Sequence, residues 1–337
     1  MVTWLLRFDM RAPKTLLGTG KPGRAEPQAL YGAALEMARY ADEHGVYNIT
    51  LSEHHGVDDG FLPSPIALMG AMAGATKQAR LHVSALLVPL YDPVKLAEDL
   101  VVLDHLSQGR TGITAGIGYR PEEFSMFGRA WPGRGKLFDE CLEVMLRAWR
   151  GERFEWQGRA VHVTPAPYTD PHPVLWMGGQ STTGARRAAR LGLPFQPAKN
   201  DDEMVQLYYD ECERLEVEEP LVIPPGTGEM FWISEDPDRS WAEIGPHLLH
   251  EATCYRSWQR EGQESIVTSE ALTVEALRAE GLYKILTPDE AVARAEADGP
   301  AAAFPLYPLC GGTPPDLAWR SLELFVGKVL PRISSLA

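Results

Sequence analysis

Cysteine is scarce in this 337-residue sequence, and long apolar runs are missing. The four cysteines are widely spaced and form no C-x-x-C pair, which argues for reduced thiols and against a disulfide framework. The opening residues, MVTWLLRFDM, have no basic segment ahead of a long apolar core, so they predict a first strand rather than a signal peptide. We therefore expect a soluble, cytoplasmic protein with reduced, mostly buried thiols and no membrane segment.

Positive charge is also in short supply. Lysine and arginine number 32 against 46 aspartates and glutamates, which gives a formal net charge of -14 at pH 7. This balance argues against a nucleic acid or an anionic membrane as a partner. Hydrophobic residues make up 45% of the chain, enough for a sizeable core. The length suits one large α/β domain or two small ones.

Several catalytic signatures do not occur. The glycine-rich run from Gly18 to Gly23 lacks the G-x-x-x-x-G-K-[ST] spacing of a phosphate loop. There is no G-x-S-x-G nucleophile elbow and no H-E-x-x-H zinc motif, and no cysteine stands beside a histidine in the sequence. The polar loop that contains the glycine-rich run, from Phe8 to Pro27, is either a mobile flap beside a site or an ordinary surface loop.

The clearest structural pattern lies between Arg80 and Gly118. Leu81 to Leu90 is an apolar run that suits a strand buried on both faces. Asp92-Pro93 then fits an N-cap and the first helical position, and Gly109 stands where a left-handed C-terminal cap belongs. A second buried strand follows and runs into Gly116-Ile117-Gly118. This compact β-α-β unit predicts a parallel sheet with a right-handed crossover.

Strand and helix patterns alternate about eight times along the chain. We therefore predict a single domain over residues 1–337, an eight-stranded β/α (TIM) barrel with insertions near 152–165 and 235–285. The first insertion reads as a short β-hairpin. Within the second, residues 264–283 have no clear pattern and form either a lid or a dimer-facing insertion. Residues 119–133 are predicted as a loop.

Glu53-His54-His55 comes just after the second predicted strand, where the loops of a barrel carry catalysis. A histidine transfers protons near neutral pH with little tuning, so it is a candidate acid or base. A loop histidine bonded to backbone is the simpler alternative. A metal site is a third, but adjacent histidines point in different directions and no carboxylate or thiol cluster completes a ligand set. No metal is therefore predicted.

Two glycine-rich strand ends are candidate cofactor contacts. Gly116-Ile117-Gly118 is not a dinucleotide fingerprint, because Pro121 occupies the third glycine position. It is either bare backbone that a cofactor approaches or a tight turn. The second run, Gly178-Gly179-Gln180-Ser181-Thr182, leads into a predicted helix, and its amides and hydroxyls suit a single phosphate. An N-cap by Ser181, worth about 1 kcal/mol, is the alternative.

The run PLYDPVKLAEDLVVLDHLSQGR, followed by Gly116-Ile117-Gly118, resembles the bacterial luciferase-like flavin monooxygenases. The resemblance is strongest from Ser52 to Trp149 and weak from Asp201 to Gly281. Glu53-His54-His55 matches the E-H-H motif of the family, whose first histidine is catalytic. The resemblance therefore implies that His54 is the catalytic residue and that its two neighbours orient it or fill the wall.

The same resemblance implies a flavin site. A non-proline cis peptide at Ser84-Ala85 would form a ledge under the flavin ring, and Gly116 and Gly118 would leave backbone bare beside it. The turn of Gly178, Gly179, Gln180, Ser181 and Thr182 would bind the flavin phosphate. Luciferase has a phosphate-binding arginine where this chain has Ile117, so the phosphate would need Arg120, Arg186 or the amides alone.

The function implied is a flavin-dependent monooxygenase that oxidises a small organic substrate with O2. Reduced FMN would come from a separate flavin reductase, and relatives suggest a homodimer. One alternative is a deazaflavin-dependent hydride-transfer oxidoreductase of the same superfamily. Another is a non-catalytic partner subunit of a luciferase-like heterodimer. The sequence does not identify the substrate.

Overall fold

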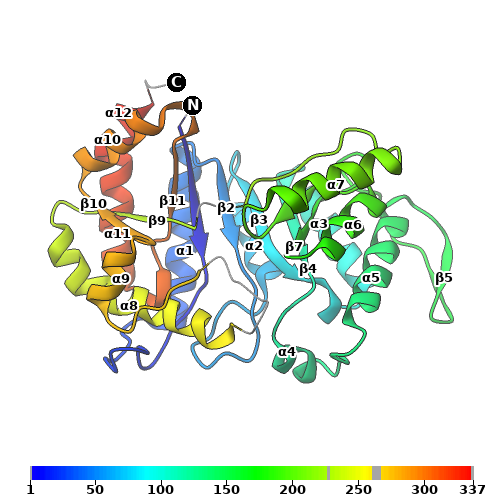
Figure 1. Cartoon of the computed structure of the whole chain (residues 1–337), viewed down its shortest axis with the longest axis horizontal. Coiled ribbons are helices and arrows are strands. Elements are labelled where there is room, and N and C mark those ends of the chain that lie inside the picture. The colour runs from blue at the N-terminus through cyan, green and yellow to red at the C-terminus, as the bar shows by residue number, and fades with distance from the viewer. Residues whose placement is uncertain (1, 226–227, 260–266, 335–337) are drawn as a thin grey trace. The chain divides into compact units, whose positions relative to one another are not determined.

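The structure, a computed structural model, describes residues 2–225, 228–259 and 267–334 (Figure 1). The chain divides into two compact units: unit 1 comprises Met1–Leu51, Val57–Pro63 and Thr227–Ala337, and unit 2 comprises Ser52–Gly56 and Ser64–Gly226. The expected single domain with insertions near 152–165 and 235–285 stays a prediction. Residues 264–266, at the start of the segment without a clear pattern, lie outside the described residues.

Unit 1 is built from parallel strands and the helices that follow them. Its elements are β1 (Thr3–Phe8), α1 (Pro27–Glu43), β2 (Asn48–Leu51), β9 (Met230–Ile233), α8 (Pro237–Trp258), α9 (Val274–Glu280), β10 (Tyr283–Leu286), α10 (Pro288–Asp298), β11 (Ala303–Leu306), α11 (Pro315–Leu324) and α12 (Leu330–Ile333). The strands lie in the order β10-β9-β11-β1-β2 and pair in parallel.

Alternate residues of β1 are buried, as the period of a strand requires. Trp4, Leu6 and Phe8 share the buried face, and the Trp4 ring packs 5.4 Å from that of Phe325, measured between centroids. Figure 1 shows α1 and α11 alongside β1 and β11. The core of unit 1 therefore lies between its parallel strands and these helices.

Unit 2 repeats the same construction and carries the candidate site residues. Its elements are α2 (Pro65–Ala75), β3 (Arg80–Leu87), α3 (Pro93–Ser107), β4 (Thr111–Gly116), α4 (Pro121–Met126), α5 (Arg134–Trp149), β5 (Phe154–Trp156), β6 (Arg159–Val161), β7 (Val174–Gly179), α6 (Thr182–Leu191), β8 (Phe195–Pro197) and α7 (Asp202–Arg214). Parallel pairing gives the order β3-β4-β7-β8.

The predicted strand-helix-strand unit is confirmed as β3-α3-β4. Asp92 caps α3, its Oδ1 accepting the backbone N–H of Val94 at 2.9 Å, and Pro93 is the first helical residue. At the other end Gln108, with φ 55°, is the left-handed cap, and Gly109 continues the turn with φ 80°. The cap therefore lies one residue earlier than predicted, because two successive residues make the tight turn into β4.

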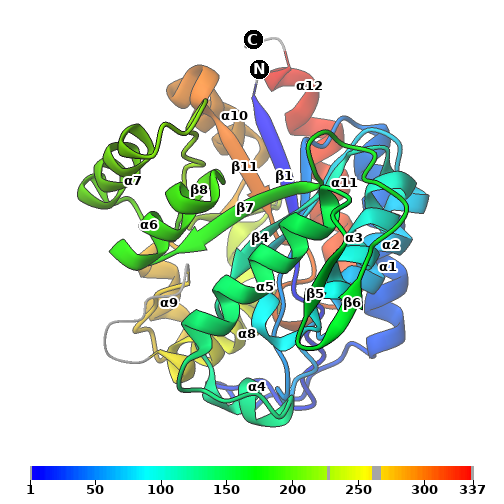
Figure 2. The same cartoon turned by 90° about the vertical axis from the view of Figure 1, so that its right-hand side faces the viewer.

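The structure differs from the sequence prediction in two segments. Residues 119–133 were predicted as a loop but contain α4, which begins at Pro121. In unit 1, α9 and β10 occupy part of the segment that had no clear pattern; Gly281, with φ 73°, ends the helix just before β10 pairs with β9. The predicted hairpin is confirmed as β5–β6, which follows α5 as a two-stranded ribbon (Figure 2).

Parallel strands alternate with helices in both units, which confirms the predicted α/β class. Within the described part of the chain, none of the helices combines the length and apolar character that crossing a bilayer requires.

Candidate functional site

Most of the predicted site residues of unit 2 stand at or just after the carboxyl ends of its strands, while Ser84 and Ala85 lie within β3. β3 ends at Leu87, β4 at Gly116 and β7 at Gly179. Because neighbouring parallel strands end at the same edge of a sheet, these ends form one edge, where sites of α/β folds occur. The segment Ser52–Gly56, with Glu53-His54-His55, packs within the same unit.

His54 is buried, with 5% of its surface exposed, and both ring nitrogens have partners. Nδ1 lies 2.8 Å from Glu123 Oε1, and Nε2 lies 3.0 Å from the hydroxyl of Tyr119. Because an ionised carboxylate has no proton to give, Nδ1–H must donate to Glu123. In the neutral imidazole, Nε2 then accepts a hydrogen bond from Tyr119. The geometry orients His54 with a basic nitrogen toward a hydroxyl.

Glu123 joins several parts of this site. Its Oε1 also accepts the backbone N–H of His55 at 3.0 Å and Nη1 of Arg120 at 3.1 Å. Burial disfavours its charge, but the hydrogen bond from His54, with help from His55 and Arg120, outweighs burial and lowers the pKa of Glu123. Within the described residues its Oε2 is buried and has no hydrogen-bond partner. Glu123 is therefore held as a carboxylate that accepts from the His54 ring.

Glu53 and His55 form a second carboxylate–histidine pair. Glu53 Oε1 lies 2.9 Å from His55 Nε2 and also accepts the hydroxyl of Tyr91, while Oε2 accepts the backbone N–H of Leu87 at 2.5 Å. Arg120 Nη1 donates to the carbonyl of His55 at 2.9 Å. The rings of the two adjacent histidines thus bond to different carboxylates, and Glu53 also links the motif to the end of β3.

The strand ends beside His54 have little side-chain bulk. The peptide between Ser84 and Ala85 is cis, as the family resemblance implied. A Cβ added at Gly116 would lie 2.8 Å from Ala85 Cβ. Gly118 has φ 79°, a left-handed conformation that favours glycine, and a Cβ there would lie 3.0 Å from the ring of Phe124. Only glycine leaves this backbone bare, and such a surface fits a flat ring.

The turn from Gly178 to Thr182 joins β7 to α6. Ser181 is the N-cap of α6, its hydroxyl accepting the backbone N–H of Gly184 at 3.4 Å. Gly179 packs tightly, since a Cβ there would lie 3.0 Å from the Phe195 ring and 3.3 Å from Gly184 Cα. Glycine backbone, hydroxyls and a helix N-terminus fit a single phosphate.

The two arginines suggested for the phosphate both pair with carboxylates. Arg120 lies 3.1 Å from Glu123, and Nε of Arg186 lies 3.2 Å from Glu211. A phosphate bound at this turn would therefore be contacted first by the amides and hydroxyls of the turn. The residues at both strand ends fit a flavin mononucleotide, while their cofactor-binding role stays a prediction.

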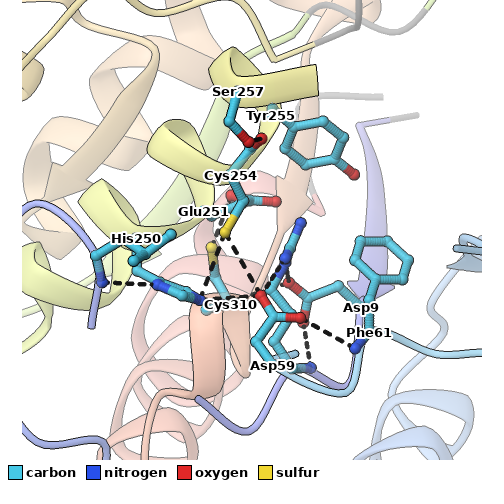
Figure 3. A network of polar contacts seen from close by, with 12 residues as sticks. Asp9, Asp59, Phe61, His250, Glu251, Cys254, Tyr255, Ser257 and Cys310 are labelled. Atoms are coloured by element: carbon cyan, nitrogen blue, oxygen red, sulfur yellow. Dashed lines mark hydrogen bonds and ion pairs between the residues drawn. The ribbon is translucent and has the colours of Figure 1, made fainter. Parts of the chain in front are cut away.

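Unit 1 contains a buried cluster that the sequence did not predict (Figure 3). Asp59, His250 and Cys254 place their metal-ligand-type atoms within 4.8 Å of one another. His250 and Cys254 have the i, i+4 spacing of a helical ligand pair, but Asp59 is 191 residues away from His250. That separation hides the group from a search for local motifs.

The hydrogen bonds of this cluster argue against a metal. His250 Nδ1 accepts the backbone N–H of Leu17 at 2.9 Å, so the ring proton is on Nε2, which donates to Asp59 at 3.0 Å. Neither nitrogen has a free lone pair, and the guanidinium of Arg11 pairs with the same oxygen of Asp59. Burial raises the pKa of the Cys254 thiol to about 12, which keeps it protonated. We interpret the cluster as a hydrogen-bonded network that fixes the loop after β1 on α8.

Sequence reasoning proposed His54 as the catalytic residue but gave no role to the two side chains that bond its ring. Glu123 and Tyr119 lie on or beside α4, in the segment predicted as a loop. A signal was present, because Pro121 followed by two glutamates is typical of a first helical turn. The contact of Glu53 with Tyr91 spans 38 residues and has no local signal.

The sequence of this chain is similar to a known protein family and to several known proteins. The family model described as "Luciferase-like monooxygenase" matches residues 14–296. The chain is 25% identical over 210 residues to the oxygenase component of the flavin-dependent trigonelline monooxygenase of Acinetobacter baylyi, covering 58% of each chain. It is 31% identical over 165 residues to the N-acetyl-S-alkylcysteine monooxygenase of Bacillus subtilis, covering 48% of each. The chain spans about half the length of the curated relatives it matches.

Solved structures match almost the whole chain. Monooxygenase RslO1 from Streptomyces bottropensis aligns with a TM-score of 0.71 and 23% identity, over 98% of this chain and 99% of that one. The oxygenating constituent of 3,6-diketocamphane monooxygenase from Pseudomonas putida, in complex with FMN, gives 0.69 and 20% over the same shares. An F420-dependent secondary alcohol dehydrogenase with an F420-acetone adduct gives 0.63 and 17%, again over 98% and 99%. These likenesses concern the fold alone, and they confirm the predicted β/α-barrel class.

Proposed function

The chain belongs to the luciferase-like monooxygenase family, and on that premise we propose that it is a flavin-dependent monooxygenase that oxidises a small organic substrate with O2. The observation that carries the proposal is the oriented histidine, His54 between Glu123 and Tyr119, in the same unit as the glycine ends of β4 and β7. Reduced FMN, when bound, supplies the electrons for the activation of O2.

Two groups of residues in unit 2 would bind different parts of the flavin. Ser84, Ala85, Gly116 and Gly118 would contact the flavin ring, because they present backbone and small side chains. The phosphate would bind at the turn before α6, through Gly178, Gly179, Gln180, Ser181 and Thr182. A helix N-terminus and amides suit a phosphate without a dedicated arginine.

His54 would act as the base of the reaction by accepting a proton at Nε2. Glu123 stabilises the protonated ring once Nε2 has accepted a proton, and Tyr119 lies at hydrogen-bond distance from that nitrogen. The pair therefore provides a base whose charged form is compensated inside a buried site. Glu53 and His55 would hold the backbone of the motif in place.

A separate flavin reductase is the proposed source of reduced FMN. The Acinetobacter relative is named as an oxygenase component and the Pseudomonas structure as an oxygenating constituent. Those names support a division of labour in which this chain receives a reduced flavin. We also propose a homodimer and a cytoplasmic location, in line with the sequence analysis.

The test is O2 consumption by the purified chain with FMN, a flavin reductase and a panel of small organic substrates. We expect substrate-dependent oxidation by the wild type and a loss of roughly 10²- to 10⁴-fold in H54A with flavin binding retained. H162A changes an exposed histidine next to the hairpin and is the matched control. Hydride transfer with a deazaflavin and no O2 use would favour the dehydrogenase alternative. If the purified chain alone neither bound flavin nor consumed O2, the result would favour a non-catalytic partner subunit.

A further inference from the structure

A chain of hydrogen bonds crosses the sheet of unit 2 beside the Ser84–Ala85 peptide. Thr114 Oγ1 donates to Gln196 Oε1 at 2.7 Å, and His82 Nε2 lies 2.8 Å from Thr114 Oγ1. Ser84 Oγ lies 3.5 Å from the same oxygen of Gln196. His82, Thr114 and Gln196 have no part in the chemistry proposed above, so their arrangement needs its own explanation.

The register of the strands explains how Gln196 reaches this position. Residues paired across parallel strands share a face, as do residues two apart in one strand. Ser84 pairs with Thr114, Thr114 with Trp176, and Gly178, two residues further along β7, pairs with Gln196. Gln196 therefore lies on the face of Ser84. A Cβ at Gly178 would lie 2.9 Å from Thr114 Cγ2, so this glycine leaves the path across β7 open.

The direction of the hydrogen bonds sets the orientation of the Gln196 amide. The Thr114 hydroxyl has one proton, which it gives to Gln196 Oε1, so His82 Nε2–H must donate to Thr114. Burial lowers the pKa of His82 to about 3, and the neutral ring packs 4.2 Å from that of Trp176. Gln196 Oε1 therefore already accepts a hydrogen bond from Thr114, and the NH2 group of the same amide is directed away from Thr114.

Burial shows which of these side chains a ligand can reach. His82 and Thr114 are buried, whereas Ser84, Ala85 and Gln196 are half-buried. Ser84 and Gln196 share a face and each keeps some exposed surface, so a ligand beside β3 can reach that face. A flat contact of glycines and alanines does not distinguish one polar ring edge from another, but an oriented N–H donor does.

We infer that Gln196 is a specificity-determining residue that donates an amide hydrogen bond to a carbonyl or ring-nitrogen acceptor of the bound flavin. The inference rests on the proposed function, since it requires a flavin at the strand ends. Thr114 and His82 are positioning residues that act through Gln196. Gly178 has a part here that is separate from phosphate binding, because it admits the side chain of Gln196.

Anaerobic and aerobic titrations with FMN test this assignment through affinity, visible spectrum and midpoint potential. Q196L removes the donor and should weaken FMN binding roughly tenfold, with a shifted flavin spectrum. In Q196E, one carboxylate oxygen still accepts from Thr114, and the other replaces the NH2 donor proposed to face the flavin. Q196E should therefore lose more affinity than Q196L and lower the midpoint potential, while its melting temperature without flavin stays close to that of the wild type.

T114V tests the positioning role, and we expect a smaller loss in the same direction. The control is Q206L, because Gln206 is an exposed glutamine on α7 that bonds Asp210 at 2.8 Å. Wild-type affinity, spectrum and potential in both Q196L and Q196E would overturn the role of Gln196 and leave the proposed function standing. A wild-type chain that binds no FMN would instead overturn the proposed function, and the inference with it.

Discussion

Glu123 Oε1 lies 2.8 Å from Nδ1 of His54, and the same oxygen accepts the backbone N–H of His55. One carboxylate on α4 thus fixes the ring of the proposed catalytic histidine and the backbone that follows it. Because Nδ1 must donate to this carboxylate, Nε2 is the nitrogen available for proton transfer. The proposed role of His54 as a base depends on this hydrogen bond.

The first prediction concerns the charge of Glu123. In E123Q the shape is kept, but a neutral amide no longer compensates a protonated His54. We expect the oxidation rate to fall about 10- to 100-fold, less than in H54A, with FMN affinity within twofold of wild type. Steady-state kinetics with saturating reduced FMN measure this. E122Q alters the exposed neighbour on α4 and is the matched control; equal losses in the two variants would contradict the role of Glu123.

Acid stability gives a second prediction from the same residue. The pKa of Glu123 is lowered in the folded chain, from an ordinary value of 4.5. A depressed carboxyl pKa contributes stability that is present above the unfolded value and is lost as pH falls through the folded one. The stability advantage of wild type over E123Q should therefore shrink below about pH 4.5. Urea unfolding at pH 7 and at pH 3.5 checks this, and a difference independent of pH would count against it.

A third prediction tests the bare edge of β4. In G116A the new Cβ would meet Ala85 Cβ at 2.8 Å, so one of the two strands has to shift. Overpacking of this kind costs roughly 1–3 kcal/mol, and we expect FMN affinity to fall more than tenfold. G74A is the control, because Gly74 in α2 has no atom within 4 Å of an added Cβ. FMN titration of both variants measures the effect, and unaltered binding by G116A would remove Gly116 from the cofactor site.

A fourth prediction concerns unit 1. Burial raises the pKa of Asp9 to about 6, from an ordinary value of 3.8, although Nε of Arg11 lies 3.0 Å away. The folded chain therefore binds more protons than the unfolded chain between these values, and this contribution to stability falls as pH rises from about 4 to 6. The melting temperature of D9N, relative to wild type, should rise over that window. A constant difference between pH 4 and pH 7 would show that Asp9 does not titrate there.

Much of the fold followed from local patterns in the sequence. The Asp92-Pro93 cap, the apolar strand before it and the glycine after α3 lie close together in the chain, so periodicity and capping rules located them within a residue or two. His54 was found in the same way, from a histidine just after a predicted strand together with a family motif. These features depend on neighbours in sequence.

The missed features depend on contacts between distant residues. The pairing of His54 with Glu123 spans 69 residues, and that of Thr114 with Gln196 spans 82. The network of Asp59, His250 and Arg11 likewise joins three separate segments. Such contacts are set by strand register and helix packing, which no local pattern encodes. Only the folded chain brings Glu123 to His54 and Gln196 to Thr114.

The most direct test of the central claim is anaerobic titration of the chain with reduced FMN and, in parallel, with a reduced deazaflavin, followed by rapid mixing with oxygenated buffer. We expect reduced FMN to bind more tightly than the deazaflavin. We also expect bound FMN to be reoxidised through a spectrally distinct phase, absent for free FMN and shortened in H54A. Tight deazaflavin binding without reaction with O2, or failure to bind either cofactor, would contradict the proposed function.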